Sequence, residues 1–214
     1  MTDPGASFDR ATVRLIAITD SLRDGPRGLA LRAAAAVEGG ATMVQLRLKE
    51  ESARSLVEIA RLVRTMIPGV PLLINDRADV ALASGADGVH VGVDDLSPAL
   101  LRRIAPAGFI IGASVGSDDE VERAEGADYV GIGPVYATGS KPDAGAAIGP
   151  ARFSELARRC GVPAVAIGGI SAETVPGVVA AGADGIAVIS ALFGAPDPTL
   201  AARVLRAALD ASGR

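Results

Sequence analysis

Short apolar runs alternate with helical patterns along the whole chain. Apolar runs rich in β-branched residues indicate strands, and polar residues recurring at helical spacing between them indicate helices. The predicted strands are 13–19, 43–48, 71–74, 88–91, 109–113, 129–132, 164–167 and 185–189. The predicted helices are 26–38, 53–67, 78–83, 98–104, 118–124, 150–159, 172–180 and 198–211. The pattern therefore predicts eight strand–helix pairs.

A weak internal repeat supports this count, because a Gly-Ala pair precedes each even-numbered strand in 39–46, 84–91, 125–132 and 181–188. A glycine just past a helix takes the left-handed conformation without steric cost, and the chain can then turn into the next strand. Eight parallel strands with right-handed helical returns close into a single (β/α)8 TIM barrel, an α/β fold. A doubly wound sheet of eight strands is the alternative.

Composition favours one domain over residues 1–214, with a frayed N-terminus over 1–12. A chain of 214 residues that is 49% hydrophobic can bury a full core, and barrels of this length are undivided. A net charge of −4 provides no basic field for nucleic acid or anionic lipid, which favours a small soluble partner. The first residues lack a signal-peptide pattern, and no apolar run approaches the ~18 residues of a membrane span, so we expect a cytoplasmic protein. A homo-oligomer is possible. The one cysteine excludes an intrachain disulfide and a Cys/His metal site.

Polar residues cluster where the predicted strands end. In 45–49, alternation sends Gln45, Arg47 and Lys49 to one side and the two leucines to the other. A closed parallel barrel has no edge strand and buries both faces, so these polar side chains point to function rather than to a solvated edge. Ser114 follows the fifth strand in the same way.

Carboxylates follow two neighbouring strands: Asn75-Asp76 after the third, and Asp94-Asp95 after the fourth. Mg²⁺ is typically held by one or two carboxylates together with substrate phosphate oxygens and water. Capping of the following helices is an alternative role for Asp76 and for either of the other two. His90 stands inside an apolar strand, which favours a hydrogen-bonded barrel histidine over a catalyst.

A long loop after strand 129–132 carries Thr138, Ser140 and Lys141. Only two of the 21 basic residues are lysines, and both follow predicted strands, although ordinary solvated charges would also explain them. Gly169 and Ser190 follow the seventh and eighth strands, where barrels often bind phosphate through backbone N–H groups. Together these positions predict two anion pockets at one barrel mouth.

The chain resembles thiamine phosphate synthases over nearly its whole length. The matching segments are 16–20, 45–49, 74–77, 88–92 with Asp95, 131–141, 166–170 and 189–190, in the same order and spacing. The resemblance implies a barrel enzyme that joins hydroxymethylpyrimidine diphosphate to thiazole phosphate, with Mg²⁺ as cofactor and release of diphosphate. No enzyme nucleophile is implied, because the electron-rich aminopyrimidine stabilises the cation left behind.

The resemblance also implies a role for each site residue. The pyrimidine diphosphate pocket would be formed by Gln45, Arg47, Lys49, Asn75, Ser114 and Lys141, of which Arg47, Lys49, Ser114 and Lys141 would be catalytic. Asp76 and Asp95 would hold the metal. The thiazole phosphate would be bound by Thr138, Ser140, Gly169, Ile189 and Ser190.

The sequence departs from the family pattern at Leu48, Ser140 and Gly116, where the family usually has an acid, often a threonine and often a histidine. A related group, the thiazole tautomerases, relies on a histidine after strand five, and that place is Gly116 here. A tautomerase-like isomerase is therefore one alternative function. A non-catalytic barrel that senses a phosphorylated ligand is another.

Overall fold

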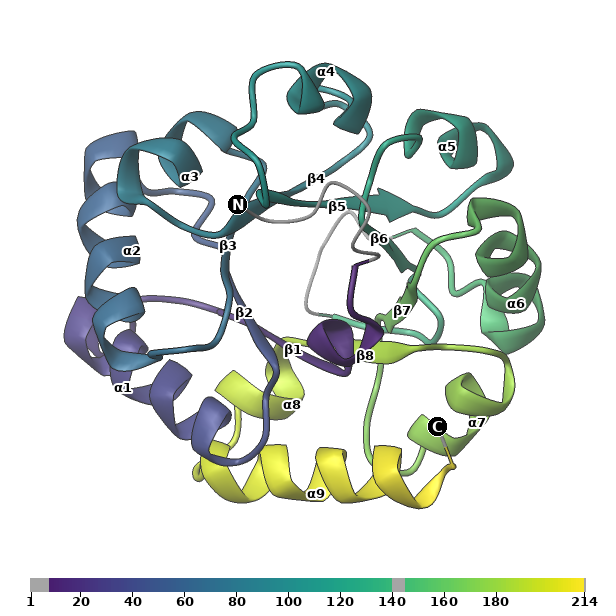
Figure 1. Ribbon diagram of the computed structural model, residues 1–214. Helices are drawn as coiled ribbons and strands as arrows, with labels where there is room; N and C mark the ends of the chain where they lie inside the picture. The colour runs from purple at the N-terminus through teal and green to yellow at the C-terminus, as the bar shows by residue number, and fades with distance from the viewer. Residues whose placement is uncertain (1–7, 140–144, 214) are drawn as a thin grey trace.

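Eight short parallel strands close into a barrel, in which consecutive strands pair and β8 pairs back with β1 (Figure 1). The structure is a computed structural model that describes residues 8–139 and 145–213. The strands are β1 (Leu15–Ile18), β2 (Met43–Leu46), β3 (Leu72–Asn75), β4 (Gly88–Val91), β5 (Ile110–Val115), β6 (Tyr129–Ile132), β7 (Ala164–Ile167) and β8 (Gly185–Val188). The β1–β8 pair confirms the predicted (β/α)8 barrel and excludes the doubly wound sheet.

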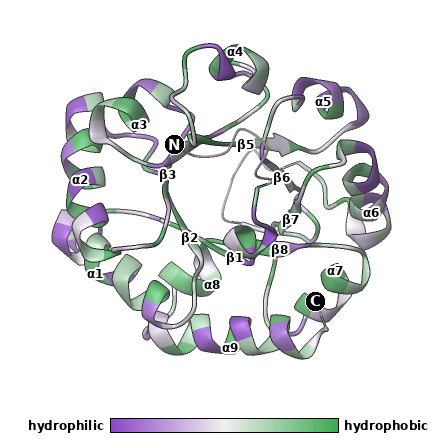
Figure 2. Ribbon diagram, in the orientation of Figure 1, coloured by the Kyte–Doolittle hydropathy of each residue, from purple (hydrophilic) through white to green (hydrophobic). Residues whose placement is uncertain are grey.

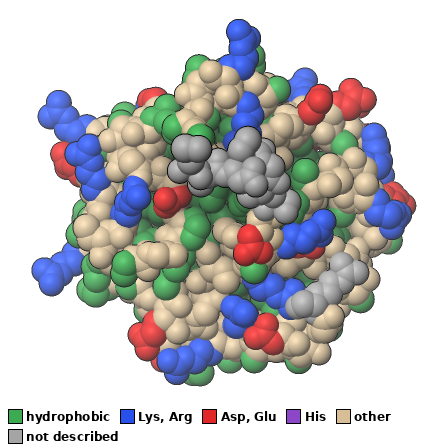
Figure 3. Space-filling model, in the orientation of Figure 1, with side chains coloured by type: hydrophobic (Ala, Val, Ile, Leu, Met, Phe, Trp, Pro, Cys, Tyr) green, Lys and Arg blue, Asp and Glu red, His purple; other side chains and the backbone are tan. Residues whose placement is uncertain are grey.

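An outer ring of helices covers the barrel. These are α1 (Gly25–Glu38), α2 (Ala53–Met66), α3 (Ala78–Ser84), α4 (Pro98–Arg102), α5 (Asp118–Arg123), α6 (Gly149–Cys160), α7 (Val175–Ala180), α8 (Ser190–Phe193) and α9 (Pro198–Ala211). In Figure 2 the long helices carry both hydrophobic and hydrophilic positions, as expected for helices with one face on a core. On the face of the molecule in Figure 3, Lys/Arg and Asp/Glu side chains are interspersed around the outer ring. The helices within the described residues are each too short or too polar to cross a lipid bilayer.

Several predicted bounds agree with the structure residue for residue, among them β4, β6, β7 and α9. The other predicted bounds differ from the structure by one to three residues at an end. The helix predicted over 172–180 begins at Val175, because the Thr174 hydroxyl accepts a hydrogen bond from the Ser171 N–H at 2.8 Å and holds that segment as a turn. The second strand ends at Leu46 rather than at residue 48.

The internal repeat has two structural functions. Its glycines at 40, 85, 126 and 182 all have positive φ, between 73° and 109°, which confirms the predicted left-handed turn. Two residues further on, a side-chain oxygen accepts a hydrogen bond from a backbone N–H at the start of the preceding strand, at 2.7 to 3.0 Å. The acceptors and donors are Thr42 with Leu15, Asp87 with Leu72, Asp128 with Ile111, and Asp184 with Ala164. The repeat thus ties neighbouring strands together at the base of the barrel.

The barrel interior is a separate apolar cluster, made of Val13, Ile16, Ile18, Met43, Leu73, Tyr129, Val165 and Ala187. A short 3-10 helix, η1 (Arg10–Val13), precedes β1, and Phe8 stacks on Tyr129 with ring centroids 6.2 Å apart. Figure 1 shows this segment, in purple, within the ring of strands. The expectation of a frayed end over 1–12 is therefore wrong for residues 8–12, because Phe8 and η1 close the floor of the barrel.

Candidate active site

A cavity of about 460 Å³ opens at the carboxyl ends of the strands. Every predicted site residue that lies within the described part of the chain lines it: Gln45, Arg47, Lys49, Asn75, Asp76, Asp95, Ser114, Thr138, Gly169, Ile189 and Ser190. Ser140 and Lys141 lie outside the described residues. Because the carboxyl ends of all eight parallel strands lie at one end of the barrel, residues from most of the chain meet in this cavity.

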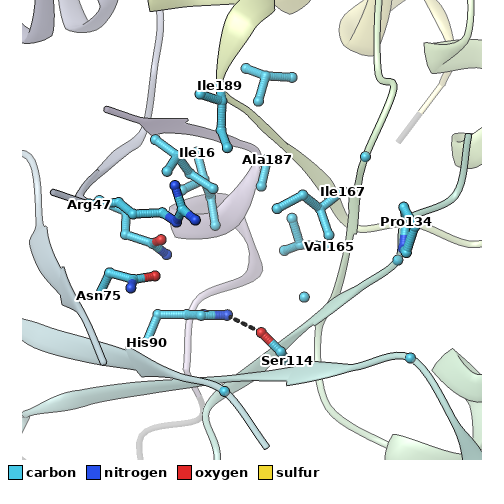
Figure 4. Close-up of a pocket in the computed structure, with 18 of the residues that line it drawn as sticks. Ile16, Arg47, Asn75, His90, Ser114, Pro134, Val165, Ile167, Ala187 and Ile189 are labelled. Atoms are coloured by element: carbon cyan, nitrogen blue, oxygen red, sulfur yellow. Dashed lines mark hydrogen bonds between the residues drawn. The ribbon is translucent and has the colours of Figure 1, made fainter. Parts of the chain in front are cut away.

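β2 supplies the basic wall of the cavity. Gln45 is 3% exposed and lies deepest, followed outward by half-buried Arg47 and exposed Lys49. The Thr19 hydroxyl, at the end of β1, accepts a hydrogen bond from the Arg47 N–H at 2.8 Å and donates one to the Arg47 carbonyl at 3.3 Å. This pair of bonds continues the β1–β2 pairing beyond the strands and fixes the backbone from which Arg47 enters the cavity (Figure 4).

Asp76 and Asp95 form a carboxylate pair on the rim. Asp76 has φ of 63°, and its N–H donates to the His90 carbonyl at 2.8 Å. Asp95 accepts a hydrogen bond from the Gly92 N–H at 2.8 Å. Burial raises the pKa of Asp76, and the neighbouring charge and hydrogen bond of Asp95 raise it further, whereas Lys49 and Arg47 oppose the rise. The two carboxylates are therefore close enough to repel each other.

Neither carboxylate is a helix cap. The N-cap of α3 is Arg77, and Ser97 caps α4 by accepting a hydrogen bond from the Leu100 N–H. The capping role considered for Asp76, Asp94 and Asp95 is thus excluded. Asp94 is exposed and Asp95 is half-buried.

Three polar side chains form a hydrogen-bonded chain at the bottom of the cavity. The Tyr129 hydroxyl lies 3.0 Å from His90 Nδ1. His90 Nε2 lies 3.0 Å from Ser114 Oγ, the hydrogen bond drawn as a dashed line in Figure 4. This confirms His90 as a hydrogen-bonded barrel histidine. Tyr129 was not among the predicted site residues, because it stands at the start of an apolar strand, where its type indicates core.

The opposite wall is apolar, and Ile189 is the one residue of it that the sequence predicted. Figure 4 shows Arg47, Asn75, His90 and Ser114 along one side, and Val165, Ile167, Ala187 and Ile189 along the other. The sequence signal for this wall is weak, because period-two alternation inside buried parallel strands does not distinguish the barrel interior from its outside. A cavity with one charged and one apolar wall suits a flat ring that carries an anionic group.

A second hollow adjoins the first, and both are lined by Arg47, Thr138, Gly169, Ile189 and Ser190. Gly168 and Gly169 both have positive φ, 92° and 63°, so the chain after β7 turns as only glycine readily does. Ser190 begins the short helix α8 at this point. The hollow lies where the sequence predicts a second anion pocket, and its binding of an anion stays a prediction.

A (β/α)8 barrel with basic, carboxylate and hydroxyl groups converging on two adjoining hollows belongs to the class of barrel enzymes that act on small phosphorylated substrates. The family described as "Thiamine monophosphate synthase" matches residues 15–192. The chain belongs to this family.

Individual relatives agree. A thiamine-phosphate synthase from Azorhizobium caulinodans is 50% identical over 204 residues, covering 94% of this chain and 96% of its own. One from Methanoculleus marisnigri is 52% identical over 186 residues, covering 84% and 88%. The solved thiamine phosphate pyrophosphorylase from Pyrococcus furiosus superimposes with a TM-score of 0.84 at 38% identity, covering 96% of this chain and 99% of its own.

Proposed function

We propose that this chain joins 4-amino-2-methyl-5-hydroxymethylpyrimidine diphosphate to thiazole phosphate, giving thiamine phosphate and diphosphate. The observation that carries the proposal is the single cavity in which the basic wall, the carboxylate pair and the phosphate-type hollow meet, in a chain of this family. The reaction breaks the bond between the pyrimidine methylene carbon and the diphosphate oxygen, and the thiazole nitrogen forms the new bond to that carbon.

The basic wall stabilises the departing diphosphate. Arg47 and Lys49 bring positive charge to the leaving group, and the Asn75 amide and Ser114 hydroxyl add uncharged donors. Preorganised donors of this kind lower the barrier because their stabilisation grows as charge develops on the leaving oxygens. Lys141 is a further catalytic candidate on sequence grounds, as Ser140 is for binding.

The apolar wall has the complementary task. After diphosphate leaves, the electron-rich aminopyrimidine carries the positive charge, and water would trap the cation. Val165, Ile167 and Ala187 form a surface on which a ring can lie without water. The enzyme needs no nucleophile of its own if it holds the thiazole ring against the pyrimidine cation. Proximity of two reacting groups lowers the barrier by several kcal/mol, about 7–11 at best.

The carboxylate pair fits Mg²⁺. Asp76 and Asp95 are hard oxygen donors; burial and then repulsion from Asp95 raise the pKa of Asp76, and a divalent cation would relieve that repulsion. No group of three or more His, Cys, Asp or Glu side chains within the described residues gathers as a metal cage, so substrate oxygens and water would complete the coordination. Bound there, the ion would neutralise part of the diphosphate charge.

The second hollow suits the thiazole phosphate. Gly169 and Ser190 border it, with Thr138 and Ile189 beside them. Backbone N–H groups at a glycine turn and at a helix start attract a phosphate. Arg47 lines both hollows and lies between the two anions.

The two alternative functions have less support. A tautomerase needs a proton-transfer group after β5, but Gly116 has no side chain and its N–H is bound by the Glu120 carboxylate at 2.6 Å. A ligand-sensing barrel would not need the carboxylate pair beside the basic wall.

One experiment separates all three functions. The two substrates are mixed with the enzyme, with and without Mg²⁺, and thiamine phosphate and diphosphate are measured. We expect both products in equal amounts, only with the metal. Isomerised thiazole phosphate without diphosphate would indicate the tautomerase, and binding without product the sensor. Arg47→Ala should abolish most of the turnover, whereas Arg27→Ala, an exposed arginine of α1, should not.

A cytoplasmic location, a possible homo-oligomeric state and the absence of nucleic-acid partners stay predictions. Fractionation and sedimentation would test them.

A further inference from the structure

The floor of the cavity has two polar residues, Tyr129 and His90, to which the proposed reaction assigns no role. Tyr129 is 1% exposed, and its hydroxyl lies against His90 Nδ1 while His90 Nε2 lies against Ser114 Oγ, each at 3.0 Å. Burial raises the pKa of Tyr129, and a side-chain hydrogen bond with Gln45 opposes the rise, which identifies Gln45 as the donor to the Tyr129 oxygen. Tyr129 and His90 thus connect Gln45 and Ser114, the two residues of this group that are proposed to bind substrate.

Strand register brings this pair together. His90 on β4 is level with Gly112 on β5, which is level with Tyr129 on β6. A Cβ on Gly112 would lie 2.4 Å from Tyr129 Cζ and 2.5 Å from His90 Nδ1, so only glycine leaves room for the two rings to meet across β5. Phe8 stacks on Tyr129 with an interplanar angle of 16°. Gly112 therefore leaves the space in which the His90 and Tyr129 rings meet, and the Phe8 ring packs against Tyr129.

The protons in the chain can be placed. Burial raises the pKa of Tyr129 far above neutral pH, so its hydroxyl keeps its proton. The oxygen already accepts from Gln45, and the hydroxyl proton therefore points to His90 Nδ1. A neutral His90 then carries its own proton on Nε2 and donates it to Ser114 Oγ. Ser114 is left to donate its proton away from His90, and the amide oxygen of Gln45 is left to accept.

We infer that Tyr129 and His90 are positioning residues that set the hydrogen-bonding direction of Gln45 and Ser114, making Gln45 an acceptor and Ser114 a donor toward the substrate. This rests on the proposed function. A ligand that matches this pair has an N–H group that donates to Gln45 and, beside it, an acceptor for Ser114. An aminopyrimidine with an anionic substituent has this pattern. An oxo group in place of the amino group would set two acceptors against each other at Gln45, so the chain also selects between these pyrimidines.

The composition of the chain allows a direct test of the tautomer, because His90 is its one histidine. Protein labelled with ¹⁵N-histidine gives the spectrum of this residue alone, and two-bond proton–nitrogen correlations identify which ring nitrogen carries the proton. We expect the Nε2–H tautomer in the parent enzyme and a mixture in Tyr129→Phe. A parent with the proton on Nδ1 overturns the inference, whether or not the enzyme turns over.

Kinetics test the positioning role. Tyr129→Phe keeps the ring and removes the hydroxyl, and we expect it to lower kcat/KM for the pyrimidine diphosphate about tenfold, with KM for thiazole phosphate unchanged. In a Ser114→Ala background the same change should cost clearly less than in the parent, because the part of the effect that passes through Ser114 is already lost and only the part through Gln45 is left. Equal losses in both backgrounds would contradict the inference.

Two further variants separate positioning from folding. His90→Gln keeps an N–H donor near the Nε2 position and should retain more activity than His90→Leu at equal thermal stability. Tyr136→Phe removes the hydroxyl of the chain's other tyrosine, which does not line the cavity, and should leave activity unchanged. Absence of turnover in the parent would refute the proposed function alone, because the tautomer measurement stands without it.

Discussion

Replacing Thr19 by valine should loosen Arg47 while leaving the barrel folded. Thr19 is fully buried, and its hydroxyl bonds both the N–H and the carbonyl of Arg47, at 2.8 and 3.3 Å. Valine has nearly the same shape and suits the β-conformation, but its methyl group can neither accept nor donate. The Arg47 N–H then loses its acceptor at the point where the guanidinium enters the cavity.

The size of the effect follows from these contacts. Leaving a buried donor unsatisfied costs about 1–3 kcal/mol. For a chain of this length each kcal/mol lowers Tm by roughly 2–4 °C, so Tm should fall by about 2–12 °C. If the displaced guanidinium loses ~1.4 kcal/mol of its hold on the departing diphosphate, kcat falls about tenfold.

Thr42→Val is a matched control. The Thr42 hydroxyl makes the same pair of bonds to one residue, accepting from the Leu15 N–H at 3.0 Å and donating to its carbonyl at 3.3 Å, but at the base of the same two strands. Thermal unfolding and steady-state kinetics of both variants, at a temperature where both are folded, should show similar losses of stability and a loss of kcat only for Thr19→Val. Equal kcat values would refute the claim that Thr19 positions Arg47.

Three further predictions concern the rest of the cavity. Asp95→Asn should lower kcat by about 10²-fold and Asp94→Asn by less than about threefold in the Mg²⁺-dependent assay, and the reverse order would move the metal to Asp94. The pKa of Asp76 is raised from 3.8 on folding, so between 3.8 and the raised value the folded protein binds more protons than the unfolded chain, and stability falls as the pH rises through this range. Ionised Asp76 therefore lowers stability at neutral pH, and this cost disappears on acidification. Without divalent cations Asp76→Asn should therefore melt higher than the parent at pH 7 but not near pH 4, and added Mg²⁺ should raise Tm only in the parent. Gly169→Val places a side chain at φ 63° with its Cβ 2.6 Å from the Ala137 carbonyl oxygen, and should raise KM for thiazole phosphate more than about tenfold, whereas Gly139→Ala, with no neighbour within 4 Å, should not.

The fold could be predicted because its determinants are local. Apolar runs mark the strands, and a glycine with positive φ ends the helix before each even-numbered strand. The sequence does not predict η1 and α8, because each is four residues long and too short to show the 3.6-residue hydrophobic period of a helix. Phe8 was assigned to a frayed end because its partner, Tyr129, belongs to the sixth strand, and nothing in the first residues indicates that contact.

The site could be predicted wherever a polar residue follows a strand. Arg47, Asp76 and Ser190 stand out because charge or a hydroxyl interrupts an apolar pattern. Tyr129 does not stand out, because an aromatic residue in a strand ordinarily indicates core. Its role depends on register across three strands, with Gly112 between it and His90, and register cannot be read from one strand at a time.

The two ends of the barrel divide stability and chemistry between them. At the mouth, Asp76 has a strained backbone and faces a second carboxylate, and both features oppose folding. At the base, the aspartates of the repeat each bind a strand N–H and also pair with an arginine: Asp87 with Arg64, Asp128 with Arg102, and Asp184 with Arg10. A hydrogen bond to a charged group contributes about 1.5–3 kcal/mol, roughly what one strained residue costs. Because both ends belong to the same short strands, ties at the base hold the register on which the mouth depends, and removing one should lower stability without changing the order of residues around the cavity.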